Sequence, residues 1–514
     1  MKKAIYTILL FTGFVSSLLL SGCRDDFSKL DLDKIAGVTI DTTGQSSLSV
    51  FQFDRLVVDP VLQTSIPAED LEFEWKINLQ PNGLDYTVMS TEKKLDFEVS
   101  LIPTSANSLH QVTLTVTDKK TSLQYIMAWP LTIRNSIGEG LVIAETPDGA
   151  NTDISHIMSP LVTSNYSGES IKRRVFSTVN GYTLPGLTTQ LLYTRRLSEP
   201  VLLGITDNSL YSIKTLDYTF FANSEDLFFA APPVIRPQFL GGFKQGTTQL
   251  AFLVNDGKLH GDIFSNTVFG RAADFPYVLP KHIALNPQGN IMVHFYDEVN
   301  GKFIYRPTIH SFGDRNMHVM GSATGPFNPA DVPDKAVLAS INNQNDQFLH
   351  LLKDKASSQI GLYISTGGGY IDPNIISPAP VALISLAGAP DINNAKHFVL
   401  LDNQQVLYYA TETKIYAAIY GAAVPRFEER YTVPNGEKIT TLQVFQQPDY
   451  PVRDLAVSPP YLATNNRQLI MSTYGTEGKV YLLPMINVGE GDIDVSKIKT
   501  FGGFDRIIAI APQL

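Results

Sequence analysis

The feature that most constrains the fold is a hairpin unit that repeats through residues 141–514. Each unit is an apolar strand, a turn rich in Gly, Asn or Asp, and a second apolar strand, as in Leu250–Val254, Asn255–Gly257 and Lys258–Phe264. Such repeats are typical of β-propellers, whose blades take about 40 to 50 residues each. Roughly seven to nine blades fit this length, and the visible hairpins favour seven. A long pair of sandwiches or a β-solenoid is the alternative, because the sequence lacks a Trp-Asp signature and regular spacing.

The two ends of this region predict how the ring closes. Leu141–Ala144 begins the region with an apolar strand, and Arg506–Ala511 ends it with another. Placing the first and last strands in one blade removes open sheet edges, which are prone to unwanted pairing. We therefore expect these two segments to pair.

Residues 36–135 have a different pattern of short, alternating strands. Leu71–Ile77 and Val112–Asp118 alternate apolar and polar residues, and Tyr125–Ile133 supplies a last strand. About a hundred residues of this kind predict an immunoglobulin-like sandwich. Trp75 is expected to be a core aromatic of that sandwich rather than a ligand platform.

The N-terminus is typical of a bacterial lipoprotein signal. Lys2 and Lys3 precede an apolar run, Ala4–Leu20, and Leu20-Ser21-Gly22 leads directly into Cys23. A charged segment, an apolar segment and a small-residue cleavage site define a secretory signal. The cysteine thiol after that site is the expected acyl attachment point. A transmembrane anchor is the alternative, but the run is shorter than the ~20 apolar residues that a span needs.

Acidic residues follow the lipidation site at once. Arg24, Asp25 and Asp26 resemble the acidic surface-export signal of Bacteroidetes lipoproteins. A solvated acidic linker is the alternative interpretation, because residues 24–35 are polar throughout. The resemblance implies that the mature protein is anchored in the outer membrane by lipid and faces the cell exterior.

Composition excludes several classes of function. Cys23 is the single cysteine, so thiol catalysis, cysteine zinc sites and iron–sulfur clusters are not expected. The net charge of −10, without a basic run, argues against nucleic-acid binding, which requires clustered Lys and Arg. No cofactor is predicted.

Catalytic and metal motifs are also missing from the sequence. The nine histidines form neither His-x-x-x-His nor His-Glu-x-x-His. His294 and His350 lie in apolar segments predicted to be strands, which favours core positions for both. Gly321–Gly325 lacks a serine at the nucleophile position. The acidic loops Asp148–Asp153 and Gly489–Asp494 do not match a calcium loop and are interpreted as turns. No metal site and no catalytic residue are predicted.

Aromatic residues are abundant, with 22 Tyr and 28 Phe. The densest groups are Tyr218–Phe221, Phe228–Phe229 and Tyr408–Tyr409. We expect most of them in the propeller core, with some exposed rings suited to sugar or peptide capture. The ligand-binding residues are not predicted.

A family resemblance rests on three segments of the first domain. Phe73–Trp75, Leu95–Phe97 and Leu114–Asp118 resemble the polycystic-kidney-disease (PKD) type sandwich, and more narrowly the PKD-like lipoproteins of Bacteroidetes nutrient-uptake loci. Asn78-Leu79-Gln80 stands where many PKD domains carry Gly-Asp-Gly. The chain is expected to have four parts: a signal peptide (1–22), a lipidated N-terminus and tether (23–35), a PKD-like sandwich (36–135) and a propeller (136–514).

The resemblance implies an accessory role beside a SusC/SusD-type TonB-dependent importer of the outer membrane. Such a protein would be non-catalytic, would bind an oligomeric nutrient (an oligopeptide or an oligosaccharide), and would hold it near the importer. A structural docking partner is the second interpretation. The third is a surface enzyme that degrades glycans or peptides at the central face of the propeller, which the absence of motifs disfavours without excluding it.

Overall fold

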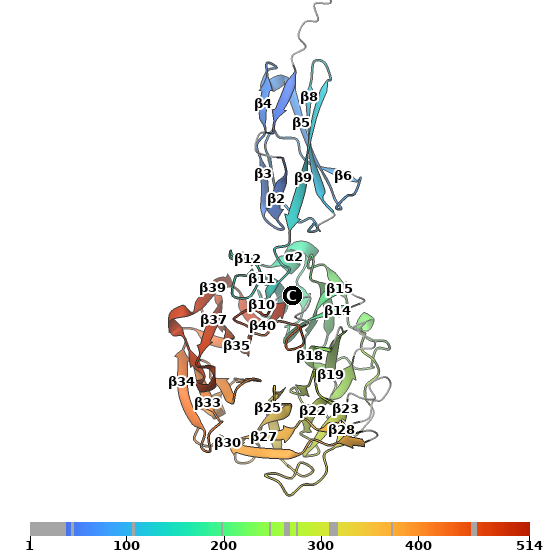
Figure 1. Ribbon diagram of the computed structural model, residues 1–514. Coiled ribbons are helices and arrows are strands. Elements are labelled where there is room, and N and C mark those ends of the chain that lie inside the picture. Colours follow the sequence, from blue (N-terminus) through green and yellow to red (C-terminus); the bar gives the residue numbers. More distant parts are fainter. Residues whose placement is uncertain are drawn as a thin grey trace, which may run out of the picture. The chain divides into compact units, whose positions relative to one another are not determined.

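The computed structural model describes ten ranges of the chain, which are residues 37–42, 46–104, 108–196, 199–245, 248–261, 268–273, 276–307, 317–371, 374–453 and 460–514. The proposed signal peptide and the candidate residues Cys23, Arg24, Asp25 and Asp26 lie outside these ranges. The regular secondary structure of the described chain is almost all β-strand, as predicted (Figure 1). Its contacts divide it into two compact units, the first within residues 1–131 and the second mainly residues 132–514.

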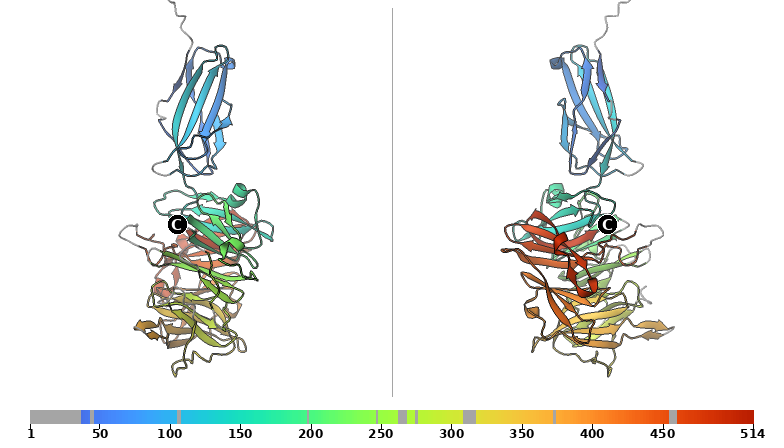
Figure 2. Two further views of the ribbon diagram at one scale, coloured as in Figure 1. Left: turned by 90° about the vertical axis from the view of Figure 1, so that its right-hand side faces the viewer. Right: turned by 60° about the vertical axis from the view of Figure 1, so that its left-hand side comes forward.

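The N-terminal strands form one large sheet and two small ones. The five-stranded sheet has the order β2 (Leu48–Phe51), β9 (Gln124–Arg134), β8 (His110–Asp118), β5 (Leu71–Asn78) and β6 (Tyr86–Ser90). The two-stranded sheets are β1 (Val38–Asp41) with β4 (Val61–Thr64), and β3 (Arg55–Val58) with β7 (Leu95–Glu98). A 3-10 turn, η1 (Ala68–Asp70), precedes β5. The three strands predicted between residues 71 and 133 are therefore confirmed (Figure 2).

Two tryptophans form the centre of the first unit. Trp75 on β5 is fully buried and stacks on Trp129 of β9, with ring centroids 5.8 Å apart. The Trp75 indole nitrogen donates a hydrogen bond to the Glu92 carbonyl at 3.0 Å, which satisfies the one polar atom that burial would otherwise leave unpaired. Trp75 is a core residue, as predicted.

Seven antiparallel sheets of three to five strands succeed one another in the described part of the second unit. Their strands are, in chain order from the first sheet, β10 (Gly140–Thr146), β11 (Asn151–Met158), β12 (Ser170–Lys172) and β13 (Leu184–Pro185); then β14 (Gln190–Arg196), β15 (Glu199–Ile205), β16 (Leu210–Lys214) and β17 (Phe220–Ala222); then β18 (Pro237–Gln245), β19 (Thr248–Asn255) and β20 (Lys258–Gly261); then β21 (Ala284–Leu285), β22 (Ile291–Asp297), β23 (Lys302–Pro307) and β24 (His318–Val319).

The remaining three sheets follow in the same way. Their strands are β25 (Lys335–Asn342), β26 (Gln347–Asp354), β27 (Ile360–Thr366) and β30 (Pro380–Ser385); then β31 (His397–Leu400), β32 (Val406–Ala410), β33 (Lys414–Ile419) and β34 (Arg426–Thr432); then β35 (Lys438–Val444), β36 (Gln468–Tyr474), β37 (Gly478–Ile486), β38 (Asp492–Ile493) and β39 (Lys499–Phe504). The last strand of the chain, β40 (Arg506–Gln513), joins the first sheet. A small hairpin, β28 (Gly369–Ile371) and β29 (Asn374–Ile376), lies between β27 and β30. The described helices of this unit are α2 (Val175–Asn180), η2 (Glu225–Leu227), η3 (Ile392–Asn394), η4 (Val488–Glu490) and η5 (Val495–Lys497).

One strand of each sheet faces the centre of a ring. These inner strands are β40, β14, β18, β21, β25, β31 and β35, and each one contacts the next, with β35 returning to β40. Figure 1 shows the sheets of the second unit arranged around a common centre. The second unit is a β-propeller, as the hairpin repeat predicted.

Buried apolar clusters fill the spaces between neighbouring sheets. Between the first two sheets, Val142 and Ala144 pack with Leu202 and Tyr211, and corresponding clusters lie between every following pair. Residues that alternate along a strand point to opposite faces of its sheet, so each sheet supplies apolar side chains to both neighbours. This is why the strands are apolar almost throughout rather than alternating.

The ring closes through the C-terminal strand. β40 pairs with β10 in antiparallel register, with Val142 opposite Ala511 and Ile143 opposite Ile510, so the predicted pairing of the two ends is confirmed. The Gln513 side chain fixes this strand further, since its amide nitrogen donates to the Ile137 carbonyl at 2.5 Å and its oxygen accepts from the Tyr218 hydroxyl at 3.1 Å.

Candidate central cavity

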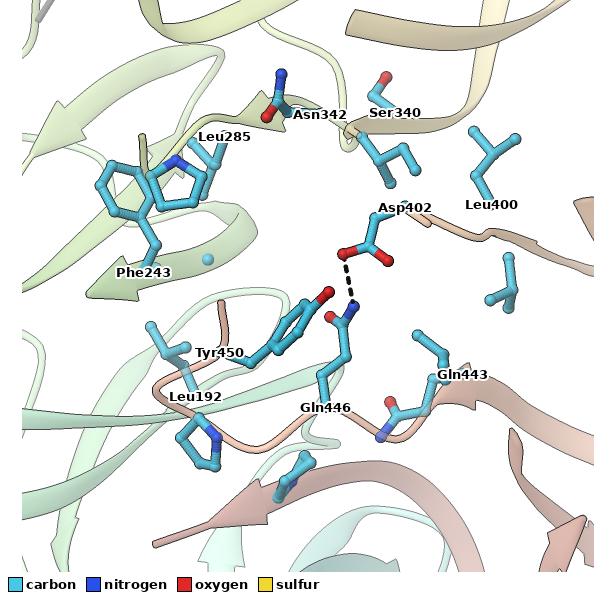
Figure 3. A pocket seen from close by; sticks show the side chains of 18 of the residues that line it. Leu192, Phe243, Leu285, Ser340, Asn342, Leu400, Asp402, Gln443, Gln446 and Tyr450 are labelled. Carbon is cyan, nitrogen blue, oxygen red and sulfur yellow. Dashed lines mark hydrogen bonds between the residues drawn. The ribbon is translucent and has the colours of Figure 1, made fainter. Parts of the chain in front are cut away.

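A cavity of about 580 Å³ lies where the inner strands meet. All seven inner strands contribute lining residues, and each of them pairs along one edge only within the described chain. Figure 3 shows the side chains of Asp402, Gln446 and Tyr450 gathered in this space, between apolar walls. We take this cavity as the candidate functional site.

The walls of the cavity are mainly apolar. They include Leu192 on β14, Phe243 on β18, Leu285 on β21 and Leu400 on β31 (Figure 3). The backbone also comes close here, because a Cβ added at Gly242 would lie 2.5 Å from the Leu250 carbonyl oxygen. A side chain at that position could not be accommodated without moving strand β19, so glycine is required on this inner strand.

Polar side chains are placed where four successive inner strands end. Gln288 follows β21, Asn343 and Gln344 follow β25, Asp402 follows β31, and the segment from Gln446 to Tyr450 follows β35. Turn residues normally occur at such strand ends, so the local sequence looks like connecting loops. The closed ring brings these loops to one cavity.

A braced loop between β35 and β36 carries most of this polar group. Within it, Asp449 and Arg453 form a two-contact ion pair, with both nitrogen–oxygen distances 2.8 Å and both side chains almost fully buried. The Arg453 guanidinium also lies 4.3 Å from the Tyr461 ring centroid, and the Tyr461 hydroxyl donates to the Asp449 carbonyl at 3.0 Å. A planar arginine fork of this kind restricts geometry strongly. These contacts hold the described residues 447–453 of the loop in place.

Asp402 is the centre of a hydrogen-bond cluster at the cavity. Its Oδ1 accepts from Asn466 Nδ2 at 2.5 Å, and its Oδ2 accepts from Gln446 Nε2 at 3.3 Å. The Asn466 amide nitrogen also donates to the Tyr450 hydroxyl at 3.1 Å, and Gln344 Nε2 donates to the same hydroxyl oxygen. We call these five residues the Asp402 cluster. Burial, together with the negative charge of Asp402, raises the pKa of Tyr450, so Tyr450 is neutral at physiological pH.

The electrostatic character of the cavity is slightly acidic. Among its described lining residues, Asp402 is the one carboxylate, and no Lys or Arg is present. His282 also lines the cavity, and burial lowers its pKa, which keeps it neutral. Carboxamides supply most of the remaining polar groups. Such a lining suits a neutral or cationic polar ligand and disfavours an anion.

A second cavity of about 380 Å³ adjoins the first. Asn343 and Asp402 line both. Its other wall carries Arg426, which is paired with Glu490. Asp402 thus borders both cavities of the second unit.

Two histidines form a buried chain beside the central cavity. His294 Nδ1 lies 2.7 Å from His350 Nε2, His350 Nδ1 lies 2.8 Å from the hydroxyl of Ser340, and His294 Nε2 lies 3.1 Å from the Met320 sulfur. A thioether can only accept, so His294 donates to Met320, His350 donates to His294, and Ser340 donates to His350. Both rings are fully buried, as expected for core histidines.

These buried histidines predict acid sensitivity. Burial lowers the pKa of His350 and of His156 to about 3 and that of His294 further below its usual value, whereas all three recover ordinary pKa values near 6.5 when unfolded. Their stabilisation is complete above pH 6.5 and is lost as the pH falls towards 3, by about 2 kcal/mol per histidine at pH 5. Urea unfolding of the full chain should therefore show much lower stability at pH 5 than at pH 7.5.

A matched variant separates this effect from general acid unfolding. His294→Gln removes one titrating group, so the decrease in unfolding free energy between the two pH values should be smaller than in the wild-type chain, whatever its stability at pH 7.5. An equal decrease in unfolding free energy in both proteins would contradict a contribution of His294 to the acid sensitivity.

The other sequence candidates have structural roles where the structure describes them. Tyr218, Phe228, Tyr408 and Tyr409 are buried in the propeller core, and Phe229 is exposed but does not line the cavity. In the acidic loop at Asp148, the carboxylate accepts from the backbone nitrogens of Ala150 and Asn151, which is the hydrogen bonding of a turn. Asp494 likewise accepts from the Ser496 nitrogen.

Two further structural properties bear on function. No group of three or more His, Cys, Asp or Glu side chains that could hold a metal ion occurs within the described ranges. No helix among those residues has the length and apolar character needed to cross a membrane.

The residues of the Asp402 cluster could not be identified from the sequence alone. Asp402 and Asn403 look like an ordinary hairpin turn, and Gln446–Tyr450 lies in an irregular stretch without periodicity. One feature of the sequence does point to these residues, because polar residues follow the first strand of several successive repeats. That signal becomes informative only when the inner strand of each repeat is known.

Comparison with known proteins gives one family match and several structural likenesses. A model of the PKD-like family matches residues 23–187, which agrees with the resemblance of the first domain and extends through β13 of the propeller. A search of curated proteins found no match.

Three solved structures illustrate the structural likenesses. A quinonprotein alcohol dehydrogenase-like protein from Bacteroides thetaiotaomicron is 12% identical, with a TM-score of 0.48 over 93% of this chain and 98% of that one. Hydrazine synthase from Kuenenia stuttgartiensis is 8% identical, with a TM-score of 0.36 over 59% and 77%. AztD from Citrobacter koseri is 9% identical, with a TM-score of 0.37 over 86% and 99%.

Proposed function

We propose that this chain is a lipid-anchored protein of the outer-membrane surface that binds an oligomeric nutrient, a peptide or a glycan, in the central cavity of its propeller. It works beside a SusC/SusD-type importer as a non-catalytic accessory component. Each of the seven sheets is one blade, and the N-terminal strands form an immunoglobulin-like sandwich.

The observation that carries the binding role is the central cavity itself. Its volume of about 580 Å³ lies in the range of small-molecule sites, and its walls combine apolar side chains with a few convergent polar groups. The Asp449–Arg453 ion pair restrains the segment that bears Tyr450, which lowers the entropy lost when a ligand binds. An oligomer could place one end in this space while the rest of it stays outside.

A glycan-degrading activity receives less support from this cavity. Glycoside hydrolysis generally requires two carboxyl groups on either side of the bond that is cleaved. The described lining offers one, Asp402, and it is already engaged by Asn466 and Gln446. Binding without cleavage is the simpler use of this arrangement.

A cavity-filling variant tests the binding role. Gln443 lies on β35 and lines the cavity, so Gln443→Trp should occupy ligand space (Figure 3). Isothermal titration with oligomers selected on a peptide and glycan array should show a loss of affinity of about tenfold or more. The matched control is Gln359→Trp, an exposed turn position outside the cavity, which should bind like the wild type. Equal binding by both variants would contradict a central site.

The importer association is tested separately. The lipidated protein is purified from native outer membranes after mild cross-linking, and the captured proteins are identified. Recovery of a TonB-dependent channel with its SusD-type lipoprotein is expected. Confinement of binder and channel to one surface raises their effective concentration, so even a weak contact would suffice. Recovery of the protein alone would contradict the accessory role.

A further inference from the structure

The side-chain amide hydrogens of Asn466 and Gln446 are already used inside the Asp402 cluster. Asn466 Nδ2 donates to both Asp402 and Tyr450, and Gln446 Nε2 lies 3.3 Å from both Asp402 Oδ2 and Asn466 Oδ1. An amide nitrogen has two hydrogens to donate. Neither amide therefore has a hydrogen left for a ligand.

The cluster can still accept hydrogen bonds from a ligand. An ionised carboxylate can accept about four hydrogen bonds, and the side chains of the cluster supply Asp402 with three, two from amide nitrogens and one from the Tyr450 hydroxyl. Gln446 Oε1 accepts from no described residue. The Tyr450 hydroxyl oxygen already accepts from Asn466 and Gln344. A ligand that meets Asp402 and Gln446 must therefore donate.

The charge of Asp402 is also uncompensated. No cation among the described residues forms an ion pair with it, whereas Asp449 pairs with Arg453 and Glu437 pairs with Lys479. Arg426, the arginine among the described residues that line the adjoining cavity, is paired with Glu490 and Glu428. A half-buried carboxylate beside apolar walls interacts with a cation more strongly than it would in water.

An aromatic ring completes the arrangement. Tyr450 lies beside Asp402 and Gln446 in the cavity, and its ring packs edge-to-face on Tyr461 with centroids 5.4 Å apart (Figure 3). An ammonium group is attracted both to a carboxylate and to the face of such a ring. A hydroxyl group would satisfy the acceptors but would leave the charge uncompensated.

We propose that the Asp402 cluster recognises a primary ammonium group at the end of the bound oligomer. This inference rests on the proposed binding function and adds to it the chemical class of the recognised end. Two sources share this chemistry: the free α-amino group of an oligopeptide and the free amine of a hexosamine oligosaccharide. Asp402 and Gln446 accept the ammonium hydrogens, and the apolar walls surround the adjoining part of the chain.

The test compares free and acetylated amines on two proteins. The probes are tetra-alanine and glucosamine trisaccharide, each with its N-acetylated counterpart, titrated against the wild-type chain and Asp402→Asn at pH 7. We expect one free amine to bind at least tenfold more tightly than its acetylated form to the wild-type chain. The preference should disappear in Asp402→Asn, and the source that shows it identifies the ligand as a peptide or an aminoglycan.

Controls make the outcomes distinguishable. Asp207→Asn makes the same charge change at an exposed turn and should keep the preference, and thermal unfolding shows whether Asp402→Asn remains folded. Equal binding of free and acetylated probes, or an unchanged preference in Asp402→Asn, overturns the ammonium inference. If that binding is still blocked by Gln443→Trp, the central-cavity function survives. Failure of every amine probe to bind the wild-type chain also overturns the inference.

Discussion

Deletion of residues 506–514 should unfold the propeller while leaving the first unit folded. The deletion removes strand β40, which supplies the inner strand of the first sheet and pairs with β10 along its whole length. It also removes Ile507, Ala509, Ile510 and Ala511 from the clusters on both sides of that sheet. Burial of one isoleucine is worth about 1.5–3 kcal/mol, and a domain has only about 5–15 kcal/mol of net stability. The lost strand pairing adds to this deficit.

The two tryptophans make the outcome measurable for each unit. Both Trp75 and Trp129 lie in the first unit, so tryptophan fluorescence reports on that unit alone. Near-ultraviolet circular dichroism of tyrosine reports mainly on the propeller. We expect the truncated chain to keep the first signal and to lose the second. Deletion of Leu514 alone, which lies beyond β40, should change neither. A truncated chain that melts like the full-length protein would contradict closure through β40.

Replacement of Cys23 by serine should release the mature protein from the membrane. Lipid attachment needs the thiol, and Cys23 is the single cysteine of the chain, so no other residue can replace it. Fractionation of cells that express Cys23→Ser should place the protein in the soluble fraction, whereas the wild type should sediment with membranes. Sedimentation of both would show that another element holds the protein at the membrane.

The double variant Asp25→Ala, Asp26→Ala tests whether the acidic residues after Cys23 direct the protein to the cell surface. This variant keeps Cys23 and with it the proposed lipid anchor, so the protein should stay membrane-bound but become inaccessible to protease added outside intact cells. The wild-type chain, treated in parallel, should be degraded. If the double variant is degraded equally, the acidic pair is a solvated linker and not an export signal.

Much of the fold could be predicted because strands and turns are encoded locally. Asn255–Gly257 turns β19 into β20 in the structure as in the sequence, and Leu141–Ala144 pairs with the C-terminal strand as expected. A strand is predicted from a short run of apolar residues, and its ends are predicted from the Gly, Asn and Asp beside it. All of these residues are neighbours in the sequence, so a single sequence is enough to recognise them.

The cavity could not be predicted because its residues meet only when the ring closes. Leu192 and Asp402, for example, are more than two hundred residues apart in the sequence but line the same space. The conspicuous aromatic residues Tyr408 and Tyr409 fill the space between neighbouring sheets, as expected for core residues, and do not line the cavity. Tyr450, a less conspicuous residue in an irregular loop, is the tyrosine of the Asp402 cluster.

The most direct test of the central claim is a hydrogen–deuterium exchange footprint of a bound oligomer on the full chain. Amide groups that a ligand covers or orders exchange more slowly. We expect protection in three segments, residues 339–344, 398–402 and 442–453, which come from three inner strands and the loops that follow them. Protection confined to the outer strands of the propeller, or to the first unit, would contradict binding in the central cavity.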